Sequence, residues 1–213
     1  SKYLKSIIKK YNQSKGDELL EVACGTGSYL KYLKDDFKCT GTDVNEEMLK
    51  IARGKVKGIK LLKADMINFD LGKKFDVILC LFASIGYVKT YSNMKRTINN
   101  FSKHLERGGV VIIDPWHTKS TYKPESIYAT VYNGKNEKMV RLTIYKLKNN
   151  LSVLDMQYLM VEKGKSIQHF VDKHELGLFD IKKILDLMKK SGLEAKFLKK
   201  EGFGRGLFVG IKK

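Results

Sequence analysis

The glycine turn within residues 19–30 constrains the fold more than any other feature of this chain. The segment reads Leu-Leu-Glu-Val-Ala-Cys-Gly-Thr-Gly-Ser-Tyr-Leu, which is a short apolar strand, a turn and the beginning of a helix. Glycine has no side chain, so a turn that contains Gly25 and Gly27 lets the backbone come close to a ligand. After the first strand of a doubly wound parallel sheet, such a turn lies at the ligand-binding crevice.

Three further strand ends carry residues suited to ligand binding. Asp43 ends the second expected strand about 20 residues past the turn, where such folds place an acid against a pair of ribose hydroxyls. Asp65 ends a third expected strand, and residues 82–87 follow a fourth, almost wholly apolar one. We predict that these strand ends share one edge of a sheet.

The order of the expected elements gives the fold class. Strands and helices alternate as far as Asp114, which favours a parallel sheet with right-handed crossovers. Four segments with hairpin-like breaks between them then predict antiparallel strands, over 127–132, 138–148, 151–162 and 166–176. A helix over 180–190 and a closing hairpin over 194–199 and 207–211 complete the pattern. We predict a single α/β domain over 1–213, with a doubly wound, mainly parallel, seven-stranded Rossmann-like sheet and an antiparallel insertion over 118–176 that roofs the acceptor side.

The bulk composition limits the function classes. The 213 residues carry a net charge of +18, and a strongly basic protein can bind nucleic acid. The lysines are spread over the whole chain and only five basic residues are arginine, so a nucleic-acid substrate is not favoured. No apolar run approaches the ~20 residues that span a bilayer. The chain begins without a signal-peptide pattern, and its three cysteines lack metal-type spacing. We expect a cytoplasmic protein with reduced thiols and no metal.

Two other interpretations of the turn fit the sequence less well. A nicotinamide-binding fingerprint requires a third glycine three residues after Gly27, and that position is Leu30. A purely structural glycine turn does not account for the other strand ends. The segment from Glu21 to Gly27, with Ala23 in place of the first glycine, resembles the acid-x-Gly-x-Gly-x-Gly turn of the class I S-adenosylmethionine-dependent methyltransferases. The resemblance implies S-adenosyl-L-methionine as the cofactor.

Four later stretches narrow the resemblance, namely Phe-Ala-Ser-Ile-Gly-Tyr at 82–87, Asp-Pro-Trp at 114–116, Gln-His-Phe-Val-Asp-Lys-His at 168–174 and Gly-Arg-Gly-Leu-Phe-Val-Gly at 204–210. With these, residues 17–211 are similar to the nucleotide-linked amino-sugar N,N-dimethyltransferases. Those enzymes methylate the 3-amino group of a deoxyhexose carried on dTDP.

The chain departs from that family at three places. Asp114 stands where the family commonly has glutamate, and His117 stands where an aromatic residue is frequent. The family usually has an N-terminal segment with a tyrosine over the cofactor, and we expect that the printed sequence starts too late to include all of it. These differences leave the expected fold unchanged and the acceptor open.

The resemblance assigns residues to the two halves of the site. For the cofactor it implies Glu21, Ala23, Gly25, Gly27, Asp43, Val44, Met48, Asp65, Met66 and Leu81. For catalysis we expect candidates among Tyr87, His117, His169 and His174, since a histidine can take a proton from an amine near neutral pH. For the substrate we expect Trp116 and Arg205, whose guanidinium matches a pyrophosphate. His104 is expected to be an ordinary surface residue.

Three function classes follow from these assignments. The first is a methyltransferase that acts on a small molecule, such as the amine of a nucleotide-linked sugar. The second is an RNA or protein methyltransferase, although the fourth strand lacks the Asn/Asp-Pro-Pro-Tyr motif of base-amine methylases. The third is a non-catalytic cofactor-binding regulator. The expected partner is a small-molecule substrate rather than a membrane, and a homodimer is compatible with the resemblance.

Overall fold

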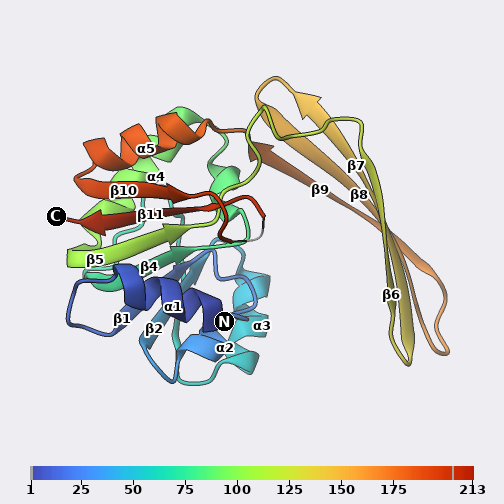
Figure 1. Ribbon diagram of the computed structural model, residues 1–213. Helices are drawn as coiled ribbons and strands as arrows, with labels where there is room; N and C mark the ends of the chain where they lie inside the picture. The colour runs from blue at the N-terminus through green and yellow to red at the C-terminus, as the bar shows by residue number, and fades with distance from the viewer. Residues whose placement is uncertain (1, 203) are drawn as a thin grey trace. The chain divides into compact units, whose positions relative to one another are not determined.

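The computed structural model describes residues 2–202 and 204–213 and forms two compact units (Figure 1). The larger unit consists of the residues up to Trp116 and from Phe179 onward. The smaller unit is His117–Leu178. The chain therefore leaves the larger unit once and returns to it.

A seven-stranded sheet forms the centre of the larger unit, with strand order β10-β11-β5-β4-β1-β2-β3. Its strands are β1 (Glu18–Val22), β2 (Lys38–Asp43), β3 (Lys60–Lys63), β4 (Phe75–Cys80), β5 (Leu105–Ile113), β10 (Leu193–Leu198) and β11 (Leu207–Lys212). β11 pairs antiparallel with both of its neighbours, and the other pairs are parallel. The predicted fold class, a mainly parallel doubly wound sheet, is confirmed. The chain reverses its strand order between β1 and β4, where such sheets bind ligands.

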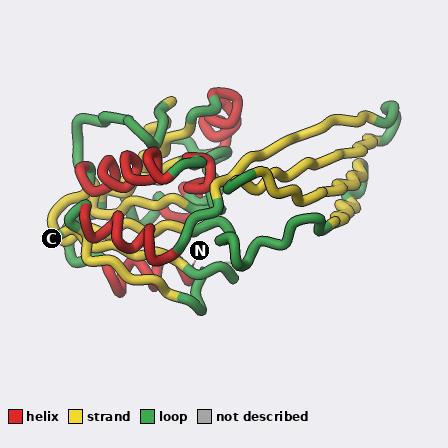
Figure 2. Tube along the Cα trace, turned by 90° about the horizontal axis from the view of Figure 1, so that it is seen from above, coloured by secondary structure: helices red, strands yellow, loops and turns green. Residues whose placement is uncertain are grey.

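Helices cover both faces of this sheet (Figure 2). They are α1 (Lys2–Tyr11), α2 (Leu30–Leu33), α3 (Glu46–Lys55), α4 (Tyr91–Lys103) and α5 (Ile181–Lys190), with a 3₁₀ helix η1 at Ser84–Val88. Successive residues of β4 enter opposite layers, because side chains alternate along a strand. Val77 belongs to the core on the α1, α2 and α3 side, whereas Ile78 belongs to the core under α4 and α5. Burial on both faces explains why this strand is almost continuously apolar.

The smaller unit is a four-stranded antiparallel sheet with strand order β6-β7-β8-β9. Its strands are β6 (Ile127–Asn133), β7 (Glu137–Lys148), β8 (Leu151–Glu162) and β9 (Gln168–Gly177). All neighbours pair antiparallel, and the hairpin turns lie where the sequence predicts them. The expected antiparallel insertion after the fifth strand is thus confirmed.

Two elements differ from their predicted bounds. The sequence predicts a helix over 28–34, but α2 begins only at Leu30, because the preceding residues form the turn in which the Gly27 N–H donates to the Cys24 carbonyl. The sequence predicts a turn at Gly108 and Gly109 and a fifth strand over 110–114, but β5 begins at Leu105, which pairs with Phe75 before the register shifts. A register shift in the pairing of β4 with β5 takes the place of the expected turn.

No membrane-spanning helix was found: within residues 2–202 and 204–213, every helix is too short or too polar for that role.

Candidate functional site

The glycine turn after β1 adopts a backbone that side chains disfavour. Gly25 and Gly27 have φ of +53° and +71°, in the left-handed region where glycine is at no disadvantage. Ala23 shares this region at φ 54°, which is uncommon for a residue with a side chain. A Cβ on Gly25 would meet no atom within 4 Å, whereas a Cβ on Gly27 would lie 3.2 Å from the Val56 side chain. Gly25 therefore faces open space, and Gly27 allows α3 to pack closely.

Asp43, at the end of β2, fastens this turn. Its Oδ2 accepts a hydrogen bond from the Gly25 N–H at 2.8 Å, and its Oδ1 accepts one from the Asn45 N–H at 2.9 Å. An ionised carboxylate offers about four acceptor positions, so two remain for further donors. Asp43 is thus held in a fixed orientation beside the open turn, with capacity for a pair of hydroxyl groups.

Glu21 is a buried carboxyl group directly under the turn. The residue is 3% exposed, and its Oε2 has no hydrogen-bond partner in the described part of the chain. Its pKa is raised to about 8, mainly by burial; a hydrogen bond from the Leu30 N–H opposes the shift, and the Asp43 charge adds to it. A buried acid with an unsatisfied oxygen is suited to a cationic or hydrogen-bonding ligand group.

The pKa of Glu21 predicts how stability depends on pH. Between about pH 4.5 and 8 the folded carboxyl keeps its proton while the unfolded one loses it, so stability falls as pH rises. One proton corresponds to at most about 1.4 kcal/mol per pH unit. In the ligand-free protein, Glu21→Gln should therefore gain stability over the wild type as pH rises from about 5 to 8. Urea unfolding of both proteins across this pH range measures the difference in their free energies of unfolding. A difference that stays constant with pH would contradict the raised pKa of Glu21.

The loop after β3 lies at the same sheet edge. The Ala64 N–H donates to the Asp43 carbonyl at 3.0 Å, and the exposed Asp65 accepts a hydrogen bond from the Ile67 N–H at 2.9 Å. Met66 is 9% exposed and belongs to the core cluster under α4 and α5. Its side chain therefore packs in the core, and only its backbone is left for the ligand contact expected of it.

The other residues expected at the cofactor differ in exposure. Val44 and Met48, beside the start of α3, are 57% and 41% exposed. Leu81, after β4, is 5% exposed and packs in the core on the α1 side. Val44 and Met48 are therefore accessible to a ligand, whereas the Leu81 side chain packs in the core beneath this edge of the sheet. Their roles stay predictions.

A strained corner connects β4 to η1. Phe82 and Ala83 both have positive φ, at 52° and 60°. Oδ2 of the fully buried Asp114 accepts a hydrogen bond from the Ala83 N–H at 3.2 Å. Burial raises the pKa of Asp114, and Arg205 opposes that shift. The corner carries Tyr87, which is 46% exposed and stays a predicted acceptor residue.

Arg205 is bound at this corner. Its Nε donates to the Pro115 carbonyl at 2.9 Å, and its Nη2 lies 3.3 Å from Oδ2 of Asp114. Its guanidinium also lies 5.5 Å from the centre of the Trp116 ring. The expected contact of Arg205 with a pyrophosphate stays a prediction, and the structure adds Asp114 as its ion-pair partner within the protein.

The three histidines expected at the acceptor all belong to the smaller unit, whereas Tyr87 belongs to the larger one. His117 lies 3.4 Å from the Thr121 hydroxyl. On β9, Nε2 of His169 lies 2.9 Å from Oε1 of Gln157, and Nε2 of His174 lies 2.9 Å from a carboxylate oxygen of Asp172. Each has a polar partner, and their catalytic roles remain predictions.

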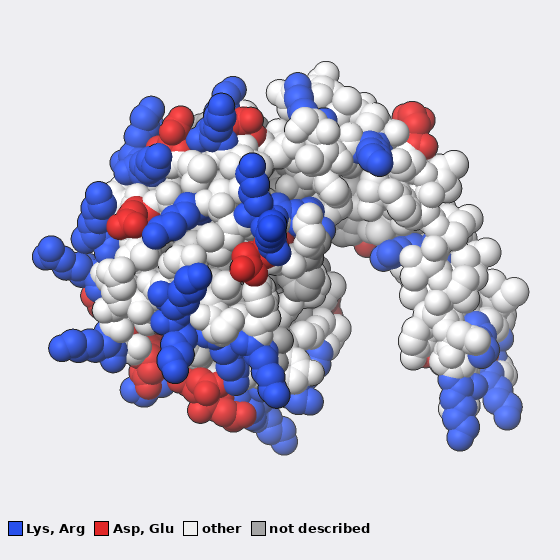
Figure 3. All heavy atoms as spheres, viewed as in Figure 1, with Lys and Arg blue, Asp and Glu red and all other residues white. Residues whose placement is uncertain are grey.

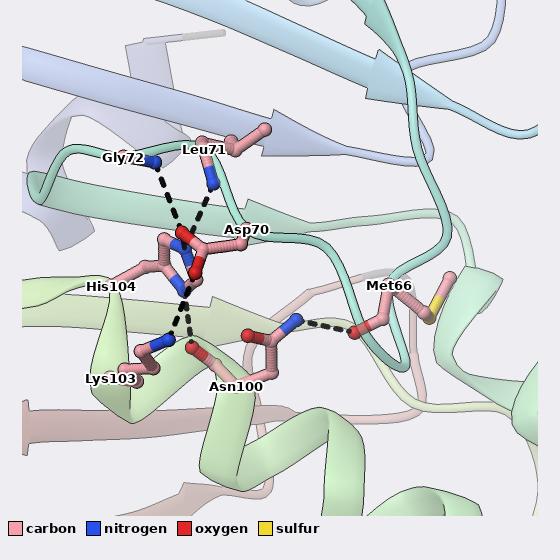
Figure 4. Close-up of polar contacts among 7 residues, drawn as sticks. All are labelled: Met66, Asp70, Leu71, Gly72, Asn100, Lys103 and His104. Carbon is pink, nitrogen blue, oxygen red and sulfur yellow. Dashed lines mark hydrogen bonds and ion pairs between the residues drawn. The ribbon is translucent and has the colours of Figure 1, made fainter.

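His104 is not the surface residue that the sequence suggested. It is 3% exposed, because it caps the C-terminal end of α4 beneath the loop that follows β3. Figure 4 shows its ring between Asn100 and Leu71, with Asp70 and Lys103 beside it. The apolar pattern of the helix before it, with Ile98 and Phe101 facing inward, could have indicated this burial.

Within the described residues, neither the buried thiol beside the turn nor metal-ligating side chains provide a second candidate site. Cys24 is buried, and burial raises its pKa to about 12, so it is a packed thiol rather than a nucleophile. Where the structure describes the chain, no three His, Cys, Asp or Glu side chains are grouped to hold a metal ion. Basic side chains are scattered among acidic ones over the visible face of the larger unit (Figure 3).

Comparison with protein families matches residues 19–109 to a family described as a methyltransferase domain. The match runs from β1 into the first half of β5 and includes the glycine turn, Asp43 and Asp65.

Comparison with characterised proteins extends the similarity to both units. The chain is 32% identical over 194 residues to dTDP-3-amino-3,4,6-trideoxy-alpha-D-glucopyranose N,N-dimethyltransferase of Streptomyces venezuelae, covering 91% of this chain and 82% of the relative. It is 31% identical to dTDP-4-amino-2,3,4,6-tetradeoxy-D-glucose N,N-dimethyltransferase of Saccharopolyspora spinosa, covering 91% and 78%. The crystal structure of Streptomyces venezuelae DesVI matches with a TM-score of 0.94 at 30% identity, covering 99% of this chain and 89% of that one.

Proposed function

Because this chain belongs to the S-adenosylmethionine-dependent methyltransferase family of the dTDP-amino-sugar N,N-dimethyltransferases, we propose that it methylates the amine of a nucleotide-linked sugar. The observation that carries the proposal is the similarity to the Streptomyces venezuelae enzyme, which spans 91% of this chain and 82% of that relative. Such coverage includes the smaller unit as well as the methyltransferase core.

The residues at the sheet edge fit the cofactor. Gly25 faces open space, which the amino-acid portion of S-adenosylmethionine would fill without a clash. Oε2 of Glu21 has no hydrogen-bond partner among the described residues. We propose that Asp43 accepts hydrogen bonds from the ribose hydroxyls and that Asp65 and the Met66 backbone bind the adenine. When bound, S-adenosylmethionine supplies a methyl group activated by its sulfonium.

The residues of this chain contribute by positioning the acceptor amine against the methyl group and by excluding water from the reacting atoms. A neutral amine is a sufficient nucleophile, so the residues around it must hold its lone pair in line and keep solvent away. Correct alignment of two reactants can lower a barrier by ~7–11 kcal/mol. We propose that one of Tyr87, His117, His169 and His174 accepts the proton that the amine gives up. Trp116 is the proposed contact for the sugar.

The position of the acceptor amine is a separate question. The Streptomyces venezuelae relative is named for a 3-amino sugar and the Saccharopolyspora spinosa relative for a 4-amino sugar. Their identities to this chain, 32% and 31%, do not separate the two. We therefore propose a dTDP-linked amino-deoxyhexose as the substrate class, without assigning the carbon that bears the amine.

Mass spectrometry of a reaction mixture tests this proposal. The protein is incubated with S-adenosylmethionine and, separately, with a dTDP-3-amino- and a dTDP-4-amino-deoxyhexose. We expect the mass of one or two methyl groups to appear on one of these sugars and not on the matching sugar that has a hydroxyl in place of the amine. Transfer RNA and a lysine-rich protein serve as competing acceptors. Methylation of either one, with none on the sugars, would contradict the proposal.

A further inference from the structure

We propose that Asn100 and His104 are positioning residues for the cofactor: they hold the loop at residues 64–72 in the shape that presents Asp65 at the sheet edge. The inference rests on the proposed cofactor site and extends it to two residues outside it. Neither residue lies on a strand end or in the glycine turn. Both lie in the C-terminal part of α4 and its cap, four positions apart, and so on one side of the helix.

Two hydrogen bonds connect these side chains to the loop backbone (Figure 4). Nδ2 of Asn100 donates to the Met66 carbonyl at 3.2 Å. The Leu71 N–H donates to Nε2 of His104 at 3.3 Å. These contacts lie near the two ends of the loop, and neither involves Asp65. Side-chain bonds to backbone groups fix the path of a segment that has no strand or helix partner of its own.

The chemistry of the imidazole determines which group can stand at position 104. Nδ1 of His104 lies 2.9 Å from the Asn100 carbonyl, which can only accept, so Nδ1 carries the proton. Nε2 is then the acceptor that the Leu71 N–H requires. A neutral side chain with an acceptor at the Nε2 position preserves this second bond. Glutamine offers such an oxygen and leucine does not.

Aromatic packing adds to the two hydrogen bonds. The Phe69 ring meets the His104 ring edge-on at 4.7 Å and stacks on Phe101 at 6.3 Å. Phe69 is 6% exposed, so the middle of the loop is buried against α4. The loop start is joined to β2 as well, since the Ala64 N–H donates to the Asp43 carbonyl. Asp65 lies between this fixed start and the segment that Asn100 and His104 hold. A shift of that segment would therefore move the Asp65 side chain relative to Asp43.

Binding of S-adenosylhomocysteine, measured by calorimetry, tests the inference without any acceptor. We expect Asn100→Ala and His104→Leu each to weaken binding about threefold to tenfold, the worth of one hydrogen bond. His104→Gln should bind nearly as well as the wild type. Hydrogen exchange of the amides of residues 65–72 should be faster in the two weakened variants, without ligand.

Asn99→Ala is the matched control. Asn99 is the neighbour of Asn100 on α4, but its side chain accepts from the Ser191 hydroxyl at the end of α5 instead of the loop. We expect this variant to keep wild-type affinity. Wild-type affinity in both Asn100→Ala and His104→Leu would overturn the inference, as would equal losses in Asn99→Ala and Asn100→Ala. If His104→Leu does not fold, the comparison of Asn100→Ala with Asn99→Ala decides. A wild-type protein that does not bind S-adenosylhomocysteine would instead contradict the proposed cofactor site itself.

Discussion

Replacing Asp43 with alanine is expected to weaken the binding of S-adenosylhomocysteine about tenfold to a hundredfold. The expected loss corresponds to about one net charge-assisted hydrogen bond to the ribose, worth about 1.5–3 kcal/mol. The substitution also removes the acceptors for the Gly25 and Asn45 N–H groups, so the turn loses its anchor. Calorimetric titration of the wild type and the variant measures the change in Kd.

Asp17→Ala is the control for this measurement. Asp17 precedes β1, at the opposite ends of the strands from Asp43, and its carboxylate pairs with Lys38 on the surface. Loss of such an exposed pair costs little, so affinity should stay at the wild-type value. Asp43→Asn keeps the shape but not the charge and should bind with intermediate affinity. Unchanged affinity in Asp43→Ala would remove Asp43 from the site.

Replacing Arg205 with alanine is expected to destabilise the protein by about 2–4 kcal/mol near neutral pH, because it leaves the Asp114 carboxylate buried without its opposing charge. The Asp114 side chain is 0% exposed, whereas that of Arg205 is 21% exposed. Because the pair is not fully buried, the expected loss of stability is smaller than for a fully buried ion pair. Without Arg205 the pKa of Asp114, already raised by burial, rises further. Stability is lost as pH rises through that pKa, so the penalty should be larger at neutral pH than near pH 4. Urea unfolding at several pH values measures it.

Arg53→Ala provides the comparison for Arg205. Arg53 pairs with Glu46 on the surface of α3, with side chains 47% and 39% exposed, and its removal should cost less than about 1 kcal/mol. Equal losses in the two variants, or a loss at Arg205 that does not vary with pH, would show that Asp114 does not depend on this arginine.

The fold could be predicted because its signals are local. The glycine turn, the acids that end β2 and β3 and the apolar run of β4 each follow from short segments, and strand order in such sheets follows known rules. The four strands of the smaller unit were predictable from alternation and turn residues. The start of β5 was not, since it depends on pairing with Phe75 across a register shift.

The contacts that support the site were less predictable than the site itself. His104 looks like a helix-end residue until the loop from β3 is folded over it. Asp114, the ion-pair partner of Arg205, is 91 residues away along the chain, so no local pattern indicates this pairing. The burial of the Met66 side chain also depends on the elements packed over it, and the expected contact of its backbone with the ligand stays a prediction. Each of these depends on a tertiary neighbour that no local pattern specifies.

A crystal structure of the protein with S-adenosylhomocysteine tests the central claim most directly. We predict the ligand at the carboxyl ends of β1, β2 and β3, with both ribose hydroxyls within hydrogen-bond distance of the Asp43 carboxylate and the adenine beside Asp65. A ligand bound at another edge of the sheet, with Asp43 bonded only to Gly25 and Asn45, would contradict it.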